Sequence, residues 1–263
     1  MADKILLGRR CAGFGDSVLF ADVILTLNKS YPHLLIDVID NGKVRLDLLD
    51  CCGCKYTPVK LPNYPYVGRC IHSVYNTRPV EKNKHLLTSM LENLCRQIPC
   101  IDFRSLDPVI AKPVVESDYK VPDGDYVVVP HYTTPFIGSR PKDYPRDKFG
   151  ELVKLMSVNG FSVYELHTSY RKEQLSYKYS SGMLTATSPV DTAKILSKAK
   201  FVVTTEGGVM HWACHNDARC YTIFKSHVHA DPSSVPYSTM VPILCYNDES
   251  PAYVMDEILK GEY

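Results

Sequence analysis

The segment that most constrains the fold runs from residue 201 to residue 224, FVVTTEGGVMHWACHNDARCYTIF. It opens with a β-branched apolar run typical of a buried strand, passes through Glu206-Gly207-Gly208 into a helical stretch, and ends with strand character. A strand that enters a helix through glycines presents unpaired backbone N–H groups and the positive end of the helix dipole. The segment therefore predicts an α/β unit with a phosphate-binding turn, and a tight turn for packing is the alternative.

A second strand–glycine–helix unit is expected at the start of the chain. Residues 4–8 are apolar, and a turn with Gly13, Gly15 and Asp16 follows them. Helical spacing of apolar residues then continues to Tyr31, and residues 34–39 are the next expected strand. A strand–helix–strand unit implies a right-handed crossover and a parallel sheet.

The remaining pattern divides the chain into two α/β halves. Expected strands lie at residues 44–49, 68–74, 126–130 and 161–166; expected helices lie at residues 84–97, from Pro145 onward, 190–198 and 251–259. Residues 100–124 are proline-bearing without periodicity, which indicates a connector. We expect an N-terminal domain over residues 1–120 and a C-terminal domain over residues 121–263, both Rossmann-like and facing a cleft. The last helix is a candidate to pack back on the first domain.

Composition narrows the class of protein. With 45% hydrophobic and 22% charged residues the chain is expected to fold, and its net charge of +1 argues against binding dominated by nucleic-acid electrostatics. No apolar run reaches the ~18 residues that span a bilayer. The N-terminus is typical neither of a secretory signal nor of a transit peptide, so a cytoplasmic location is expected.

Ten cysteines are spread through the chain, and in this compartment we expect free, mostly buried thiols. Cys51, Cys52 and Cys54 form the one dense cluster. A structural zinc site normally takes two ligand pairs, and no second CxxC is present. The sequence therefore predicts no metal.

Three regions together resemble the heptosyltransferase type of glycosyltransferase, which has the GT-B fold. The segment GFGDSVL at residues 13–19 is similar to the family's opening turn. Residues 129–149 are similar to its strand, phosphate loop and helix. Within them, Val129 is followed by Pro130-His131 where the family has His-Pro, and Tyr144 stands where the family usually has Trp. The segment EGGVMHWA at residues 206–213 resembles D-(S/T)-G-x-x-H-x-A, with Glu206 for Asp and Gly207 for Ser or Thr.

The resemblance implies an inverting, metal-independent transfer of a sugar from a nucleotide-diphosphate sugar to an acceptor hydroxyl. The acceptor is expected to be a glycan or a modified nucleobase of viral DNA, the sugar a hexose, heptose or pentose, and no cofactor is expected. Asp16 matches the family's base, which takes the proton of the acceptor hydroxyl. Its alternative role is a cap at the start of a helix.

Among the other site residues, His211 matches the family's histidine near the donor phosphates, and the rest are expected from their places beside the predicted strands and turns. A solvated loop is the alternative for Arg140 and Lys142. The donor diphosphate is expected at backbone N–H groups and side chains of Gly207, Gly208, Val209, His211, Thr133, Thr134, Arg140 and Lys142. Glu206 is expected at the hydroxyls of the donor sugar. On the acceptor side we expect Gly13, Gly15, Arg9 and Arg10.

Two other function classes stay open. A dinucleotide-dependent oxidoreductase would use the first glycine turn, but the third glycine of G-x-G-x-x-G is missing there. A non-catalytic nucleotide-sugar-binding protein would keep the fold without the chemistry. A zinc site on His211 and His215 is disfavoured because Trp212 stands where H-E-x-x-H has its glutamate.

Overall fold

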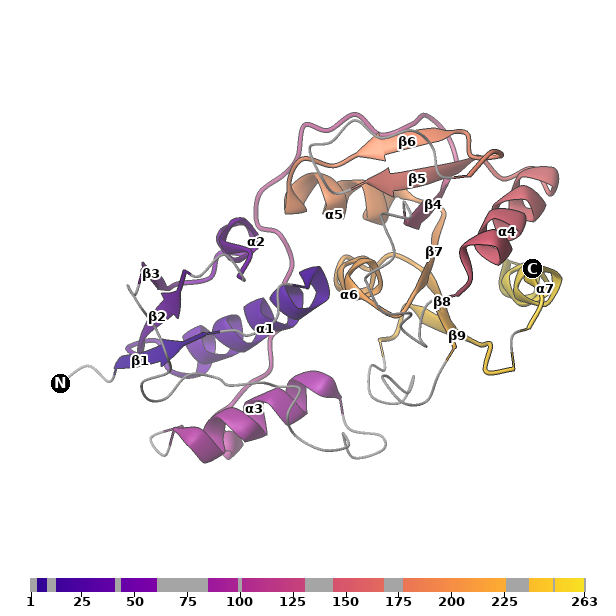
Figure 1. Ribbon diagram of the computed structural model, residues 1–263. Coiled ribbons are helices and arrows are strands. Elements are labelled where there is room, and N and C mark those ends of the chain that lie inside the picture. The colour runs from indigo at the N-terminus through magenta and orange to yellow at the C-terminus, as the bar shows by residue number, and fades with distance from the viewer. Residues whose placement is uncertain are drawn as a thin grey trace. The chain divides into compact units, whose positions relative to one another are not determined.

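The structure is a computed structural model that describes residues 4–8, 13–40, 44–60, 85–98, 101–130, 144–167, 177–225, 237–247 and 249–262 (Figure 1). The chain passes from one compact unit to another between Val115 and Glu116, and each unit is described by itself. Among the described residues, no helix is long and apolar enough to cross a membrane.

The described residues of the first unit form a three-stranded parallel sheet in the order β1-β2-β3. Its strands are β1 (Lys4–Leu7), β2 (Leu35–Ile39) and β3 (Thr57–Val59). Helix α1 (Phe14–Ser30) links β1 to β2 and buries Val18, Leu19, Val23 and Leu27, as its apolar spacing predicts. Two further helices are α2 (Leu46–Cys51) and α3 (Leu86–Gln97), and a short 3₁₀ helix spans Phe103–Ser105.

Helix α2 corrects the expectation of a strand over residues 44–49. Val44, Leu46 and Leu48 alternate with polar residues, which mimics a strand. The buried positions, however, are Val44, Leu48, Leu49 and Cys51, which follow the period of a helix. The backbone of the second predicted strand, residues 68–74, lies outside the described residues.

The connector lies along α1 and is held by a row of side-chain acceptors. Asp22 Oδ1 accepts from Ala111 N–H at 2.7 Å, Thr26 Oγ1 from Val109 N–H at 2.9 Å, and Ser30 Oγ from Asp107 N–H at 2.9 Å. Four helical residues rise about 6 Å, close to the span of two extended residues of about 6.6 Å. The spacing of every fourth residue on the helix therefore matches the spacing of every second residue on the connector, and one side chain per helical turn can bond the connector.

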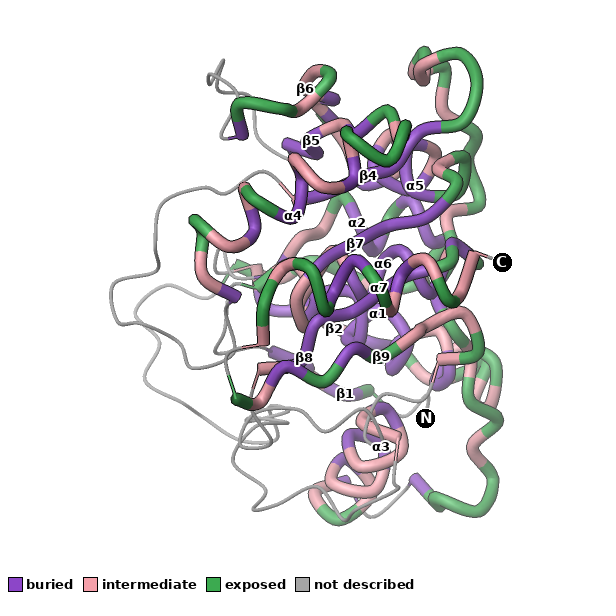
Figure 2. The backbone as a smooth tube through the Cα atoms, turned by 90° about the vertical axis from the view of Figure 1, so that its right-hand side faces the viewer, coloured by how far each residue is buried: buried purple, intermediate pink, exposed green. Residues whose placement is uncertain are grey.

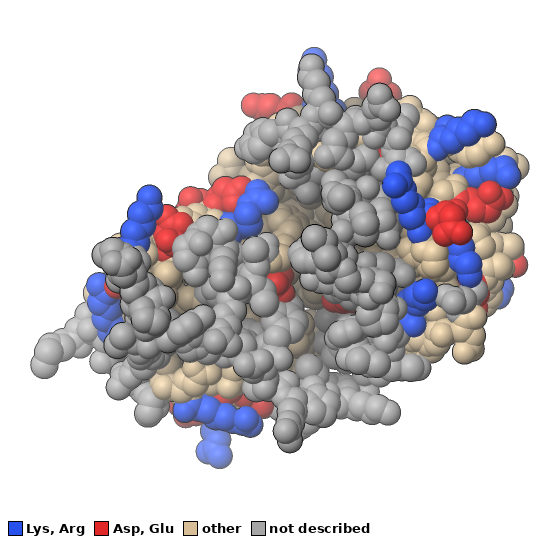
Figure 3. Space-filling model, in the orientation of Figure 1, with Lys and Arg blue, Asp and Glu red and all other residues tan. Residues whose placement is uncertain are grey.

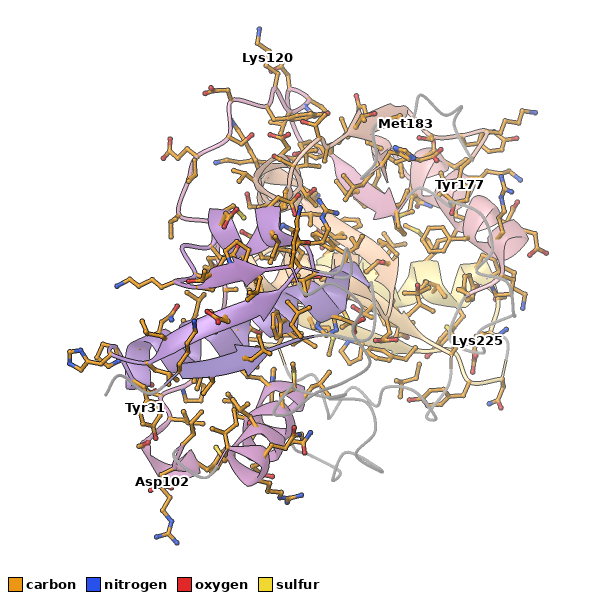
Figure 4. The ribbon with its side chains drawn as sticks, turned by 60° about the vertical axis from the view of Figure 1, so that its left-hand side comes forward. Tyr31, Asp102, Lys120, Tyr177, Met183 and Lys225 are labelled. Atoms are coloured by element: carbon orange, nitrogen blue, oxygen red, sulfur yellow. The ribbon has the colours of Figure 1, made fainter. Side chains whose placement is uncertain are left out.

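The end of the connector near its 3₁₀ turn is fixed by a tyrosine. Tyr31 Oη accepts from Asp102 N–H at 2.8 Å, and the two residues lie together in Figure 4. Val114 N–H donates to Cys51 O at 2.8 Å at the other end of the connector. The connector therefore belongs to the fold of the first unit over most of its length.

The second unit contains a six-stranded, fully parallel sheet in the order β6-β5-β4-β7-β8-β9. Its strands are β4 (Val127–Pro130), β5 (Val163–His167), β6 (Gly182–Thr185), β7 (Phe201–Thr205), β8 (Cys220–Phe224) and β9 (Met240–Leu244). Its helices are α4 (Arg146–Val158), α5 (Pro189–Lys198), α6 (Gly208–His215) and α7 (Pro251–Glu262). If β4 is counted as the first strand of this unit and β9 as the sixth, the order across the sheet is 3-2-1-4-5-6, as in the doubly wound Rossmann fold.

The helices of this unit cover both faces of the sheet (Figure 1). Helices α4 and α7 pack together over a core that includes Val127, Phe201 and Tyr221, so the last helix belongs to this core. Helices α5 and α6 pack together on the other face. Figure 2 shows β4, β7 and β8 buried, as strands covered on both faces must be.

Candidate functional site

The glycine turn after β7 begins a helix at the carboxyl edge of the parallel sheet. Gly207 is the N-cap of α6, and residues 205–209 are half-buried whereas residues 210–215 are buried. The backbone of Gly207 is extended, with φ 161°, and a Cβ built on it meets no atom of the described residues within 4 Å. Neither backbone strain nor packing therefore requires glycine at this position. Open space at a helix N-terminus is what a bound anion needs.

This turn lies at the point where the order of strands reverses. Strands β4 and β7 are neighbours, yet the chain leaves β4 toward β5 and leaves β7 toward β8. Their paired residues are Val127 with Phe201 and Val128 with Val202, so the pairing stops before either strand ends. Ligands of open α/β sheets bind outside the carboxyl ends of the strands at such a switch point.

Helix α6 is held rigidly by its buried side chains. Trp212 Nε1 donates to Pro189 O on α5 at 2.9 Å, and the indole is fully buried. His211 is 3% exposed, and its Nδ1 lies 2.8 Å from the hydroxyl of Tyr237. Both contacts fix the direction of the helix, and hence of the N–H groups in its first turn.

The glycine turn of the first unit differs from this one because it carries a carboxylate in the first turn of its helix. Gly13 is the N-cap of α1, and Asp16 is an acidic residue in the first turn of that helix. A Cβ added to Gly13 would lie 2.7 Å from Asp16 Oδ2, so the carboxylate occupies the space beside the N-cap. A carboxylate at this position interacts favourably with the helix dipole.

The two helix N-termini are therefore not equivalent as anion sites. The first turn of α1 carries its own carboxylate, whereas the first turn of α6 carries no acidic residue. The carboxylate of Asp16 would repel a phosphate at α1. At α6 the neighbouring carboxylate, Glu206, precedes the N-cap and is not part of the first helical turn.

The structure brings some of the predicted site residues together. Glu206, Gly207, Gly208, Val209 and His211 form one continuous turn and helix start in the second unit. In the first unit, Gly13, Gly15 and Asp16 share the first turn of α1. Other predicted residues lie outside the described part of the chain: Arg9, Arg10, Thr133, Thr134, Arg140 and Lys142.

In the cysteine cluster, Cys51 and Cys52 are buried and Cys54 is half-buried, all as free thiols. Cys51 Sγ lies 3.9 Å from Cys52 Sγ and donates to Leu48 O at 3.2 Å. The hydrogen bond with Cys51, together with burial, raises the pKa of the Cys52 thiol, and burial raises the pKa of Cys54 to about 12. Thiols in this state are poor nucleophiles. No group of three or more His, Cys, Asp or Glu side chains among the described residues could hold a metal ion.

Two residues beside these turns carry no signal in the sequence. Tyr237 is one of 18 tyrosines and stands outside any periodic segment. Arg45 lies over the ring of Phe14 at 5.8 Å, next to the first turn of α1, and is paired with Asp47 at 2.6 Å. The contacts of Tyr237 with His211 and of Arg45 with Phe14 join residues far apart in the chain, so only the folded structure shows them.

Solved structures with the same arrangement of elements are known. E. coli heptosyltransferase WaaC with ADP is 16% identical, with a TM-score of 0.58 over 98% of this chain and 99% of that chain. E. coli ADP-heptose lps heptosyltransferase II is 13% identical, with a TM-score of 0.60 over 98% and 100%. The chain has the GT-B fold of the heptosyltransferases.

The GT-B fold is shared by proteins of more than one activity. A putative UDP-N-acetylglucosamine 2-epimerase from Listeria monocytogenes is 13% identical, with a TM-score of 0.53 over 99% of this chain and 88% of that chain. At the level of sequence, neither a family model nor a curated protein matches. The fold alone therefore does not determine the activity, which depends on the site.

Proposed function

We propose that the protein is a glycosyltransferase of the heptosyltransferase type. It transfers a sugar from a nucleotide-diphosphate sugar to a hydroxyl of a glycan acceptor, with inversion and without a metal. The observation that carries this proposal is the contrast between the two glycine turns. One helix start is open to an anion, and the other carries a carboxylate suited to act as a base.

The donor is assigned to the second unit. Backbone N–H groups of Gly207, Gly208 and Val209 hold the diphosphate at the start of α6, at the switch point of the sheet. His211 contacts the phosphates, and Glu206, directly before the N-cap, binds hydroxyls of the sugar. The solved neighbours include WaaC with ADP and with ADP-2-deoxy-2-fluoro heptose, which supports a nucleotide diphosphate as the ligand class.

Asp16 is the proposed base. As the acceptor oxygen attacks the anomeric carbon, the Asp16 carboxylate takes the hydroxyl proton and the bond to the diphosphate oxygen breaks. The electron pair leaves with the nucleoside diphosphate, whose charge is stabilised by the N–H groups of α6. One displacement of this kind inverts the configuration at the anomeric carbon.

Basic and hydroxyl side chains complete the proposed donor and acceptor sites. Thr133, Thr134, Arg140 and Lys142 follow β4 in the chain and would neutralise or bind phosphate oxygens. Arg9 and Arg10 come between β1 and α1 and would meet an anionic acceptor.

The net charge of +1 favours a glycan acceptor over DNA. On the face shown in Figure 3, described Lys and Arg side chains are interspersed with Asp and Glu rather than gathered into one basic surface. Binding of a DNA backbone takes a stripe of unpaired cations.

The decisive experiment separates binding from transfer. Nucleoside diphosphates and nucleotide sugars are screened by calorimetry against the wild type and Gly207→Val, and transfer is measured for the wild type and Asp16→Ala. We expect Gly207→Val to fold and lose nucleotide binding, and Asp16→Ala to bind the donor but lose transfer. Donor binding with no transfer to any glycan acceptor would favour the non-catalytic alternative, and unchanged turnover in Asp16→Ala would remove Asp16 as the base.

A further inference from the structure

His211 is held by a tyrosine from a distant part of the chain. The hydroxyl of Tyr237 lies 2.8 Å from Nδ1 of His211, and the two rings meet edge to face at 5.8 Å and 85°. The same tyrosine ring packs against His215 at 5.3 Å and 64°. Because His211 and His215 are four residues apart, Tyr237 lies against one face of α6.

Tyr237 itself is anchored to the sheet. Its carbonyl accepts from Met240 N–H at 3.1 Å in the turn before β9. In the same turn Thr239 O accepts from Cys220 N–H at 2.9 Å, which joins the turn to β8. The phenol hydroxyl is therefore presented to α6 by a backbone that is fixed at two points.

A fixed hydroxyl at one ring nitrogen sets the chemistry of the other. A neutral imidazole has one donor and one acceptor nitrogen, and the partner of one nitrogen determines the tautomer. If the phenol donates to Nδ1, the ring proton stays on Nε2, which can then donate to an anion. Helical side chains tilt toward the helix N-terminus, so the imidazole of His211 is directed toward the turn that begins at Gly207.

We propose that Tyr237 is a positioning residue for the donor site, which keeps His211 in the Nε2–H tautomer and fixes the plane of its ring. This inference rests on the proposed function, in which His211 contacts the diphosphate of the donor. Tyr237 does not touch the substrate; it acts through His211. In many protein sites a functional histidine is oriented by a hydrogen bond at the ring nitrogen that does not contact the ligand.

The first test reads the tautomer directly and needs no ligand. Nitrogen NMR of the imidazole rings is compared between the wild type, Tyr237→Phe and His211→Gln, the last of which assigns the His211 signals. We expect Nε2–H in the wild type and a mixture of both tautomers in Tyr237→Phe, because the phenylalanine ring keeps the packing and loses only the hydroxyl. The same tautomer in both proteins would overturn the inference.

The second test measures binding of ADP and UDP by calorimetry. Tyr237→Phe is expected to weaken binding of whichever nucleotide binds more tightly by roughly threefold to tenfold, the range of one hydrogen bond. In a His211→Gln background the same substitution should have no further effect, because the two residues act as one unit. Equal losses in both backgrounds would show that Tyr237 acts without His211 and would contradict the proposal.

Tyr126→Phe is the matched control. It removes another buried tyrosine hydroxyl, which donates to Ile195 O at 2.8 Å, and should lower stability without changing nucleotide binding. If the wild type binds neither ADP nor UDP, the donor assignment fails, and the NMR comparison alone decides whether Tyr237 sets the His211 tautomer.

Discussion

Gly13 and Asp16 show how one residue's identity depends on the position of another. The space for a Cβ at Gly13 is taken by the end of the Asp16 side chain, at 2.7 Å. Since φ at Gly13 is −68°, its backbone is open to any residue, and only this contact requires glycine. A side chain at Gly13 would push the carboxylate away from the position in which it is expected to act.

Gly13→Ala should therefore separate activity from stability. The carboxylate can rotate away, so we expect the free energy of unfolding to fall by about 1 kcal/mol, the cost of alanine at an N-cap. Transfer activity should fall by roughly 100-fold, the low end of what a positioned base contributes. Thermal unfolding and a transfer assay on the same samples measure the two effects.

Gly150→Ala is the control for this substitution. A Cβ there would make ordinary contact with Tyr177 at 3.6 Å inside α4, so the helix should gain stability and the activity should not change. Full activity in Gly13→Ala would show that the position of the Asp16 carboxylate does not matter for transfer.

Buried thiols and a phenol make stability depend on pH on the alkaline side. Burial raises the pKa values of Cys54 and Cys245 from 9.0 to about 12, and burial with a hydrogen bond to Glu262 raises the pKa of Tyr221 from 10.0 to about 12. Above pH 9 the unfolded chain loses these protons first, while the folded chain keeps them. Stability from these groups is thus complete below pH 9 and is lost as the pH rises toward 12.

Urea unfolding under reducing conditions at several pH values between about 7.5 and 10.5 tests this linkage. The midpoint should be nearly constant at the lower end and fall above pH 9. Cys245→Ala should make the fall less steep, because one of the shifted groups is gone. A midpoint that does not change up to pH 10.5 would refute the assignment.

At the scale of elements, the row of acceptors on α1 converts a loop without periodicity into part of the fold. Asp22 is fully buried and accepts from Ala111 N–H, whereas the Ser30 contact is at the exposed end of the row. Loss of a buried acceptor leaves a backbone N–H without its bond. The inner end of the row should therefore matter more than the outer end.

Asp22→Ala is expected to lower the free energy of unfolding by about 2 kcal/mol. Ser30→Ala should cost less than about 0.5 kcal/mol, as exposed substitutions usually do. Asp22→Asn, which keeps an acceptor oxygen, should recover part of the loss. Urea unfolding of the three variants measures these differences, and equal costs for Asp22→Ala and Ser30→Ala would contradict the structural role of the row.

At the scale of the whole molecule, the second unit contains a complete sheet with both of its helical layers. All six strands, their four helices and the core around Phe201 come from residues after Val115. A unit with its own core is expected to fold alone. Its proposed donor turn, from Glu206 to His211, is also complete within it.

A chain of residues 116–263 should thus unfold cooperatively and bind the same nucleotide as the full protein. It should show no transfer, because Asp16 is in the other unit. Circular dichroism and calorimetry measure the two properties. If the fragment folds but binds no nucleotide while the full chain does, the donor site does not lie within this unit alone.

The sequence by itself determined the buried elements and the two glycine turns. Strands β4, β7 and β8 are covered on both faces, so their apolar runs are nearly continuous and can be recognised without a partner. Helices α1, α3 and α5 likewise show their buried face as a spacing of apolar residues. Glycine and a carboxylate at the turn are local signals, and so Asp16 and Gly207 could be singled out.

Only the tertiary structure decided the edges and the contacts across the chain. Strands β3, β6 and β9 lie at the edges of their sheets and were not expected from the sequence. Strand β1 also lies at an edge and was recognised from its apolar run, whereas β3, β6 and β9 bury few of their residues. Their apolar patterns are therefore too weak to identify them before they pair. Tyr237 meets His211, and Asp22 meets Ala111, for the same reason: the partners are chosen by packing of distant segments, which no local pattern in the sequence records.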